Sequence, residues 1–279
     1  MKKLSIITIC YNEPNLEKTC ESIVNQSWQD FEWIVVDGRS NEETLAVFEK
    51  YKYRIDKFVS ESDNGIYDAC NKGIKLATGE YLNFMNAGDY YFYDNVLKDV
   101  FVDKNYNAGV LYGNWYAFAS SHHNSYILAL PSTLTKEFFY INNIGHQSSF
   151  IHKSLFDKYG LYNDKLVIAG DYEKWLVFIE KGASFEYIPY IVACCNLSGI
   201  SSTDKSRDFH RKERLKIIKS YCSKEELTIL EKKYKKMFRP KYHSFWEQIF
   251  SVKNNYTKSH KIFTICGIHF ELRKFNKLQ

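Results

Sequence analysis

Apolar runs and amphipathic segments alternate through the first 85 residues, and this alternation constrains the fold more than any other feature of the chain. Leu4–Ile9 is a continuous apolar run, as expected of a strand buried on both faces, and Phe31–Val36 is a second one. Residues 16–25 carry apolar side chains at helical spacing. Strands separated by helices predict an α/β domain with a mostly parallel central sheet flanked by helices. The same pattern predicts a helix from residue 42, strands at 55–59 and 80–85, and a helix at 66–76.

Polar residues follow four of the predicted strands. The carboxyl ends of parallel strands meet at one edge of a sheet, and α/β proteins bind their ligands outside that edge. Four polar strand ends therefore predict a site rather than a coincidence. They are residues 8–12, 37–38, 60–63 and 86–89.

Isolated carboxylates and one histidine are the candidates for chemistry, and each has a structural alternative. Asp37 suits a hydrogen bond from a nucleotide base, or the shaping of its own turn. Asp89 suits Mg²⁺ or Mn²⁺, which prefer oxygen ligands, or a helix N-cap. Asp171 suits a general base or an N-cap, and His146 a phosphate contact or a structural position.

Several common signatures are missing from the sequence. There is no G-x-G-x-x-G, phosphate-binding P-loop, G-x-S-x-G or H-E-x-x-H pattern. The seven cysteines are odd in number and lack C-x-x-C, which favours reduced thiols in a cytoplasmic protein. The N-terminal apolar run ends at residues 11–14 without a cleavage pattern, so we expect a strand and not a signal peptide.

Charge divides the chain into two parts. Residues 205–279 contain 20 Lys and Arg against 7 Asp and Glu, whereas residues 1–204 contain 18 against 26. We expect a globular domain at 1–204 and a basic, mainly helical extension at 205–279. The extension suits an anionic membrane surface, although a solvated helical face explains it equally well. No nucleic-acid-binding motif accompanies it, and we expect no nucleic-acid partner.

Seven sequence blocks occur in order at residues 5–12, 22–27, 33–40, 60–74, 77–89, 145–147 and 169–173, and a further short one lies at 199–202. Together they resemble family 2 glycosyltransferases of the GT-A fold, including those that build bacterial cell-surface polysaccharides. The resemblance covers about residues 3–203. It implies a GT-A-like fold and transfer of a sugar from a nucleotide-diphosphate donor, with inversion and a divalent metal.

The resemblance also implies a role for each matching residue. The donor would be a UDP-sugar, the cofactor Mn²⁺ or Mg²⁺, and the acceptor a glycan or lipid-linked oligosaccharide at the inner face of a membrane. Asp89 would bind the metal and Asp171 would deprotonate the acceptor hydroxyl. The residues implied to line the donor site are Thr8, Tyr11, Asp37, Asp68, Asn71, Lys72, Gly88, His146 and Gln147.

Two positions depart from the family's usual pattern. Arg39 stands where a second glycine is common, and Gly88 stands where the first of two adjacent aspartates is common. The second departure leaves an alternative open, in which the chain is a catalytically inactive module that binds a sugar nucleotide or a protein partner.

Overall fold

The computed structural model describes residues 2–118, 125–197, 204–233, 250–254, 260–265 and 268–273. The predicted block at 199–202 lies outside these residues. The chain forms two compact units, Met1–Glu225 and Glu226–Gln279, and each is described by itself.

The first half of the larger unit has the predicted alternation of strands and helices. Strands β1, β2, β3 and β4 pair in parallel in the order β3-β2-β1-β4. Helices α1, α2 and α3 connect them, so the predicted parallel sheet is confirmed. The bounds are β1 Leu4–Cys10, α1 Leu16–Val24, β2 Glu32–Asp37, α2 Glu42–Tyr51, β3 Lys57–Ser60, α3 Ile66–Leu76 and β4 Tyr81–Phe84.

The second half continues the same sheet with mixed strand directions. Strand β8 pairs antiparallel with β4, and the order then runs β8-β6-β9-β5, with β7 on β6. The bounds are β5 Tyr90–Tyr91, α4 Val96–Phe101, β6 Val110–Phe118, β7 Tyr126–Leu128, α5 Lys136–Ile141, η2 His146–Ser148, β8 Ser149–His152, α6 Ser154–Tyr159, α7 Gly170–Glu180, β9 Phe185–Asn196 and α8 Asp204–Tyr221.

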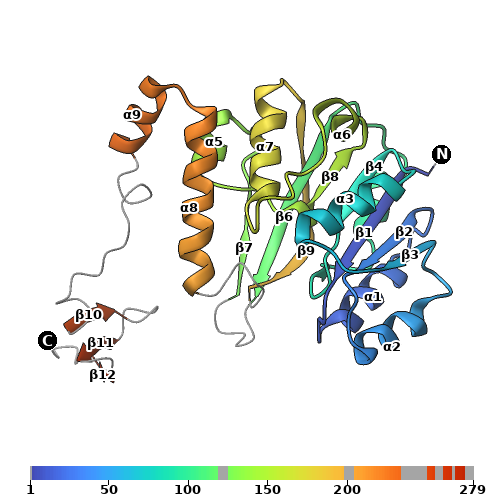
Figure 1. Cartoon of the computed structure of the whole chain (residues 1–279), viewed down its shortest axis with the longest axis horizontal. Coiled ribbons are helices and arrows are strands. Elements are labelled where there is room, and N and C mark those ends of the chain that lie inside the picture. Colours follow the sequence, from blue (N-terminus) through green and yellow to red (C-terminus); the bar gives the residue numbers. More distant parts are fainter. Residues whose placement is uncertain are drawn as a thin grey trace, which may run out of the picture. The chain divides into compact units, whose positions relative to one another are not determined.

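The larger unit has a layer of helices on each face of its sheet (Figure 1). Side chains alternate across a strand, so Leu4 and Ile6 of β1 join the core with α1 and α4, whereas Ile7 faces α3. The approach of α3 is close, because a Cβ at Gly73 would lie 2.4 Å from Cγ2 of Ile7. Two helical layers around a largely buried sheet are the architecture that the sequence pattern predicted.

Strand β9 contains a proline. It continues through Pro189 without a break. Its parallel pairing with β6 is irregular around this residue, and the register shifts between Tyr112 and Asn114 and again before Trp115. Proline cannot donate a ladder hydrogen bond, so the strand accommodates it with a register shift.

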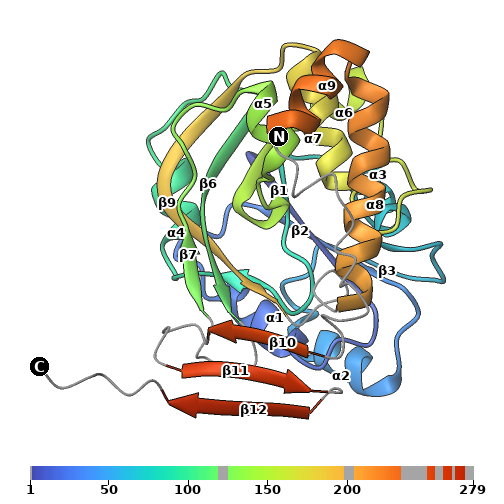
Figure 2. The same ribbon diagram turned by 90° about the vertical axis from the view of Figure 1, so that its left-hand side faces the viewer.

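The compact unit runs past residue 204, the predicted end of the globular domain. Helix α8 lies beside α7 in both ribbon views and packs against it (Figures 1 and 2). Its buried Ile217 and Ile218 show that one face of the helix belongs to the core of this unit. The basic segment that begins at residue 205 thus starts with a helix that the globular unit buries.

The extension is only partly helical. Helices α8 and α9 (Lys224–Lys233) fit the prediction, but the described residues beyond them form a three-stranded antiparallel sheet (Figure 2). Its strands are β10 Phe250–Asn254, β11 His260–Ile265 and β12 Ile268–Arg273, in the order β10-β11-β12. The prediction of a mainly helical extension did not anticipate these strands.

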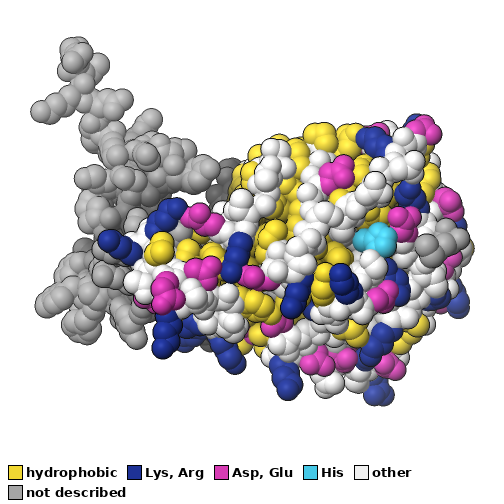
Figure 3. Space-filling view, turned by 90° about the horizontal axis from the view of Figure 1, so that it is seen from above, with side chains coloured by type: hydrophobic (Ala, Val, Ile, Leu, Met, Phe, Trp, Pro, Cys, Tyr) yellow, Lys and Arg dark blue, Asp and Glu magenta, His cyan; other side chains and the backbone are white. Residues whose placement is uncertain are grey.

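The distribution of charged side chains and of cysteines is typical of a globular domain. Positive and negative side chains are interspersed on the face that Figure 3 shows. The six cysteines in the described part of the chain that lie at positions 10, 20, 70, 194, 195 and 222 form no disulfide with one another, and the first five of them are buried. Among the helices that the structure describes, none is both long enough and apolar enough to cross a membrane.

Candidate active site

The pairing of the strands brings distant segments to the carboxyl ends of β1, β2 and β4. Strand β8 runs antiparallel to β4, with Tyr81 opposite His152, so the residues before β8 lie where β4 ends. Strand β9 runs antiparallel to β5, with Tyr90 opposite Cys194, so the end of β9 reaches Asp89. One edge of the sheet therefore gathers residues 86–89, 146–148 and 196.

Asp89 lies at the centre of this edge and is almost fully buried. Its Oδ2 accepts a hydrogen bond from Nε2 of Gln147 at 2.7 Å, and its Oδ1 accepts one from the backbone N–H of Asn196 at 2.8 Å. Burial raises the pKa of Asp89 to about 7; these two bonds oppose the rise and the charge of Glu13 adds to it. Two of the predicted site residues, Asp89 and Gln147, are thus in direct contact.

Glu13 is a carboxylate at this edge that the sequence analysis did not single out. Gly88 has a φ of +93°, and a Cβ at Gly88 would lie 3.0 Å from Cδ of Glu13. The Glu13 side chain therefore occupies space beside the position where the family commonly has an aspartate. Carboxylate oxygens of Asp89 and Glu13 fit a hard divalent cation. Among the described residues no three Asp, Glu, His or Cys side chains are grouped as a complete metal site.

Side-chain hydrogen bonds hold the turn that follows β2, next to the end of β1. The carboxylate of Asp37 is buried and accepts hydrogen bonds from the Ser40 N–H at 3.1 Å and from Oγ of Ser60 at 2.6 Å. It therefore has the turn-shaping role that the sequence left open. Tyr11 is 67% exposed and lies beside Gly38, offering a flat apolar face at this end of the sheet.

Thr8, another residue predicted to line the donor site, is as fully buried as Asp37. Its Oγ1 accepts a hydrogen bond from Nε1 of Trp33 at 3.0 Å. Its side chain is thus turned into the core between β1 and β2.

The three predicted site residues on α3 lie in two different environments. Lys72 forms ion pairs with Glu61 at 2.9 Å and with Asp68 at 3.5 Å near the end of β3. The side chains of Asp68 and Lys72 are partly exposed. Asn71 is buried, and its amide exchanges two 2.9 Å hydrogen bonds with the backbone of Tyr162. Asp68 and Lys72 therefore line the edge of the sheet, whereas the hydrogen bonds of Asn71 connect α3 to the segment before α7.

His146 is buried on the ring of Phe84 and contacts Asn86. Its Nε2 lies 3.0 Å from Nδ2 of Asn86, and burial lowers its pKa although the charge of Asp171 opposes this. A neutral ring that accepts from Asn86 at Nε2 carries its proton on Nδ1. Neither His146 Nδ1 nor Asn86 Oδ1 has a hydrogen-bond partner among the residues that the structure describes. Buried polar atoms without partners are rare, and these two suit a polar ligand.

Asp171 is the second residue of α7 and lies near the start of α3. Its Oδ1 lies 3.2 Å from the hydroxyl of Tyr67, and its Oδ2 accepts a 3.3 Å hydrogen bond from Nδ2 of Asn143. Burial, and next the charge of Asp171, raise the pKa of Tyr67 well above its usual range, so this hydroxyl keeps its proton. Sequence reasoning missed Asn143 entirely, and named Tyr67 only within a matching block.

Comparison with known proteins relates this geometry to one family. A sequence profile described as "Glycosyl transferase family 2" matches residues 5–157. The curated "PGL/p-HBAD biosynthesis glycosyltransferase" of Mycobacterium bovis is 29% identical over 213 residues, which cover 74% of this chain and 81% of that protein.

Two solved structures have the same fold. S. aureus TarS in complex with UDP-GlcNAc matches with a TM-score of 0.58 at 19% identity, over 76% of this chain and 65% of that one. Mannosyltransferase PcManGT from Pyrobaculum calidifontis, in complex with GDP-Man and Mn²⁺, matches with a TM-score of 0.55 at 16% identity, over 76% of this chain and 60% of that one. The chain spans less than two thirds of either solved chain.

Proposed function

Because the chain belongs to glycosyltransferase family 2, we propose that it transfers a sugar, with inversion, from a nucleotide-diphosphate donor to a hydroxyl group of a glycan or lipid-linked oligosaccharide. UDP is the first candidate for the nucleotide, since TarS is solved with UDP-GlcNAc. The observation that carries the proposal is that one segment contacts both carboxylates: Gln147 binds Asp89 and Asn143 binds Asp171. In the same segment His146 contacts Asn86, and each has a buried polar atom without a partner among the described residues.

The two carboxylates suit different tasks. An inverting displacement needs a base opposite the leaving group, and Asp171 would accept the proton of the acceptor hydroxyl. The Tyr67 hydroxyl and the Asn143 amide would hold that carboxylate in orientation. The Nδ1–H of His146 would donate to the donor's diphosphate or sugar. Tyr11 would stack on the base at the other end of the site.

A divalent cation completes the proposal. Asp89 and Glu13 would hold Mn²⁺ or Mg²⁺, with Gln147 orienting the Asp89 carboxylate. Such a cation stabilises the negative charge of a departing diphosphate. Among the described residues this site offers two carboxylates, so the diphosphate and water would supply the remaining ligands.

Thermal unfolding with nucleotides tests the proposal directly. A ligand that binds only the folded state stabilises it by about 2.7 kcal/mol at a hundred times its Kd. We expect UDP or a UDP-sugar to raise the Tm more with Mn²⁺ than with EDTA. No shift with UDP-, GDP- or dTDP-sugars would contradict the proposal. A shift without sugar release or transfer to any acceptor would support the inactive binding module instead.

We further propose a cytoplasmic enzyme of surface polysaccharide synthesis that contacts the membrane through residues 205–279. The excess of 20 basic over 7 acidic residues in this segment supports contact with anionic lipid. Sedimentation of the full chain with vesicles of phosphatidylcholine, with and without phosphatidylserine, tests it. We expect binding only with phosphatidylserine and loss of binding at high salt, and equal binding to both vesicles would contradict it.

A further inference from the structure

Glu213 of α8 is a buried acidic residue whose partners all lie just before α7. It is 9% exposed. Its Oε1 accepts a hydrogen bond from the N–H of Val167 at 2.8 Å, and its Oε2 accepts from the N–H groups of Ile168 at 2.9 Å and Ala169 at 2.8 Å. Hydrogen bonds to a carboxylate are shorter and stronger than neutral ones. One side chain therefore fixes three consecutive backbone amides.

These amides lead into the helix that carries Asp171. Ala169 is the N-cap residue of α7, and its methyl group cannot accept the hydrogen bonds that a serine or aspartate would. Glu213 supplies an acceptor from another helix and places a negative charge near the positive end of the α7 dipole. Without it, three amide donors beside the start of α7 would lose their acceptor.

A second contact links the same segment to Asp171. The hydroxyl of Tyr67 lies 2.6 Å from the carbonyl oxygen of Ile168 and 3.2 Å from Oδ1 of Asp171. The segment held by Glu213 thus sets both the start of α7 and the position of the hydroxyl beside Asp171. A displacement of this segment would move the carboxylate and its hydrogen-bond partner together.

We infer that Glu213 is a positioning residue for the Asp171 carboxylate. The inference rests on the proposed function, in which Asp171 is the base. It extends the catalytic apparatus to α8, which lies beyond the residues 5–157 that the family profile matches. A misplacement of about 1 Å in a reacting group costs on the order of 100-fold in rate. The structure therefore assigns to Glu213 an effect on turnover rather than on donor binding.

Glu213→Gln tests this assignment, with Lys216→Gln as the matched control on an exposed position of the same helix. The glutamine keeps the shape but replaces one acceptor oxygen by an NH2 group that faces an N–H donor. We expect kcat to fall about 10- to 100-fold, with the KM for the donor and the Kd for UDP within about twofold of wild type. Lys216→Gln should leave all three unchanged.

Stability is measured separately, because a merely structural role would lower the Tm without lowering kcat. Assays are run well below the Tm of each variant, with the folded fraction checked by circular dichroism. Glu213→Asp keeps the charge but is one methylene too short for all three amides. We therefore expect an intermediate kcat, and this variant remains informative if Glu213→Gln does not fold.

The outcomes separate this inference from the proposed function. If the wild type transfers no sugar, the proposed function fails. If the wild type transfers sugar and Asp171→Asn does not, but Glu213→Gln turns over at the wild-type rate, the positioning role is wrong. A rise of KM and Kd in proportion to the loss of kcat would also overturn it. Adding Glu213→Gln to Asp171→Asn should cause no further loss, because both act on the same step.

Discussion

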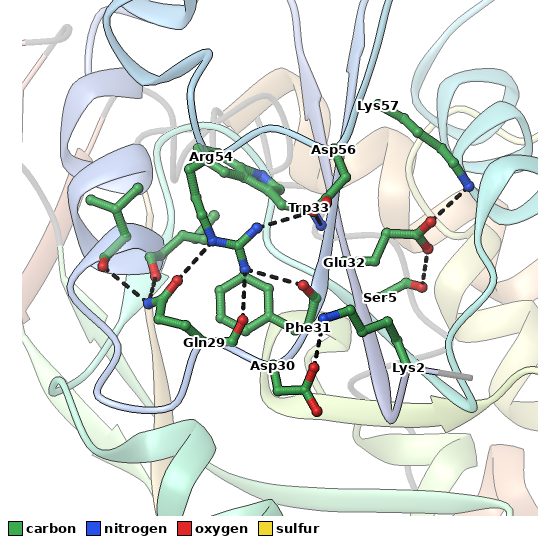
Figure 4. Close-up of polar contacts among 12 residues, drawn as sticks. Lys2, Ser5, Gln29, Asp30, Phe31, Glu32, Trp33, Arg54, Asp56 and Lys57 are labelled. Atoms are coloured by element: carbon green, nitrogen blue, oxygen red, sulfur yellow. Dashed lines mark hydrogen bonds and ion pairs between the residues drawn. The ribbon is translucent and has the colours of Figure 1, made fainter.

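Each edge of the parallel sheet has a buried carboxylate, and the pKa values of these two groups are shifted in opposite directions. At the amino edge, Glu32 forms an ion pair with Lys57 at 2.6 Å and accepts a hydrogen bond from Oγ of Ser5 at 2.6 Å (Figure 4). It also accepts a hydrogen bond from the N–H of Thr78 at 2.9 Å. Burial alone would raise the pKa of Glu32, but these partners outweigh it and the pKa is lowered. At the carboxyl edge, the two bonds of Asp89 do not offset its burial, and the pKa of Asp89 rises to about 7.

The contrast extends to the neighbouring charges. At the amino edge, Arg54 stacks 4.1 Å from the Phe31 ring centroid and pairs with Asp56 at 3.0 Å, so each charge has a partner (Figure 4). At the carboxyl edge, the charged neighbour of Asp89 is another carboxylate, Glu13. The charge of Glu32 is compensated by Lys57 within the protein, whereas the hydrogen-bond partners of Asp89 are a neutral amide and a backbone N–H, and the proposed cation would supply the missing positive charge. This difference would distinguish a structural ion pair from a binding site.

The largest effect is expected at Asp171. Asp171→Asn removes the basic group but keeps the size of the side chain and an oxygen for the Tyr67 contact. We expect transfer to fall at least about 100-fold, as loss of a general base does, with UDP affinity unchanged. Single-turnover rates and calorimetric titration with UDP measure the two quantities. Turnover near the wild-type rate would show that another group is the base.

Asp89→Asn should separate function from stability at the same edge. In the metal-free protein the folded pKa of about 7 exceeds the usual value near 3.8, so stability falls as pH rises from about 4 to 7. The asparagine does not ionise, and its NH2 group can donate to Oε1 of Gln147 if that amide turns over. We expect it to be more stable than wild type at pH 8, by less than about 4 kcal/mol because this rearrangement offsets part of the gain. It should also lose the Mn²⁺-dependent part of UDP binding. Denaturant unfolding in EDTA and titration with Mn²⁺ and UDP measure these effects; unchanged Mn²⁺ dependence would remove Asp89 as a ligand.

Glu32→Gln is the matched change at the amino edge and should have the opposite result. Loss of the ion pair with Lys57 should lower stability by about 1–3 kcal/mol at pH 7 and leave UDP affinity unchanged. The folded pKa of Glu32 is lowered, so its contribution is present at neutral pH and is lost as pH falls through that pKa. The difference from wild type should therefore shrink in acid. Weakened UDP binding in this variant would break the distinction between the edges.

The parallel half of the sheet could be predicted from the sequence because local patterns determine its strands and helices. The apolar runs of β1 and β2 and the helical spacing of α1 are visible in the sequence, and the structure has them within one or two residues of the prediction. The mixed half depends on pairing between distant strands. The register shift of β6 against β9 and the strands of residues 250–273 follow from such pairing, which periodicity does not reveal.

The candidate site shows the same limit residue by residue. The family resemblance located Asp89, Gln147 and Asp171, and the structure brings the first two into contact. It could not foresee that the amide of Asn71 binds the backbone of Tyr162, 91 residues away. Nor does any local pattern mark Glu213, whose partners lie 44 to 46 residues earlier. Contacts of this kind arise from tertiary packing and have no sequence signature of their own.

The smallest effect is expected at Arg39, whose backbone is strained at the carboxyl edge of the sheet. Asn12 and Arg39 have φ values of 49° and 66°, and with Gly88 at 93° they follow the carboxyl ends of β1, β2 and β4. A left-handed conformation costs a non-glycine residue about 1 kcal/mol, and such strain concentrates at functional edges. Arg39→Gly should relieve it, but the greater freedom of glycine in the unfolded chain offsets part of the gain. We therefore expect a stabilisation below about 1 kcal/mol, or a Tm rise of at most about 4 °C. If UDP affinity falls in the same variant, the Arg39 side chain contacts the donor, and the strain is retained because the arginine is needed there.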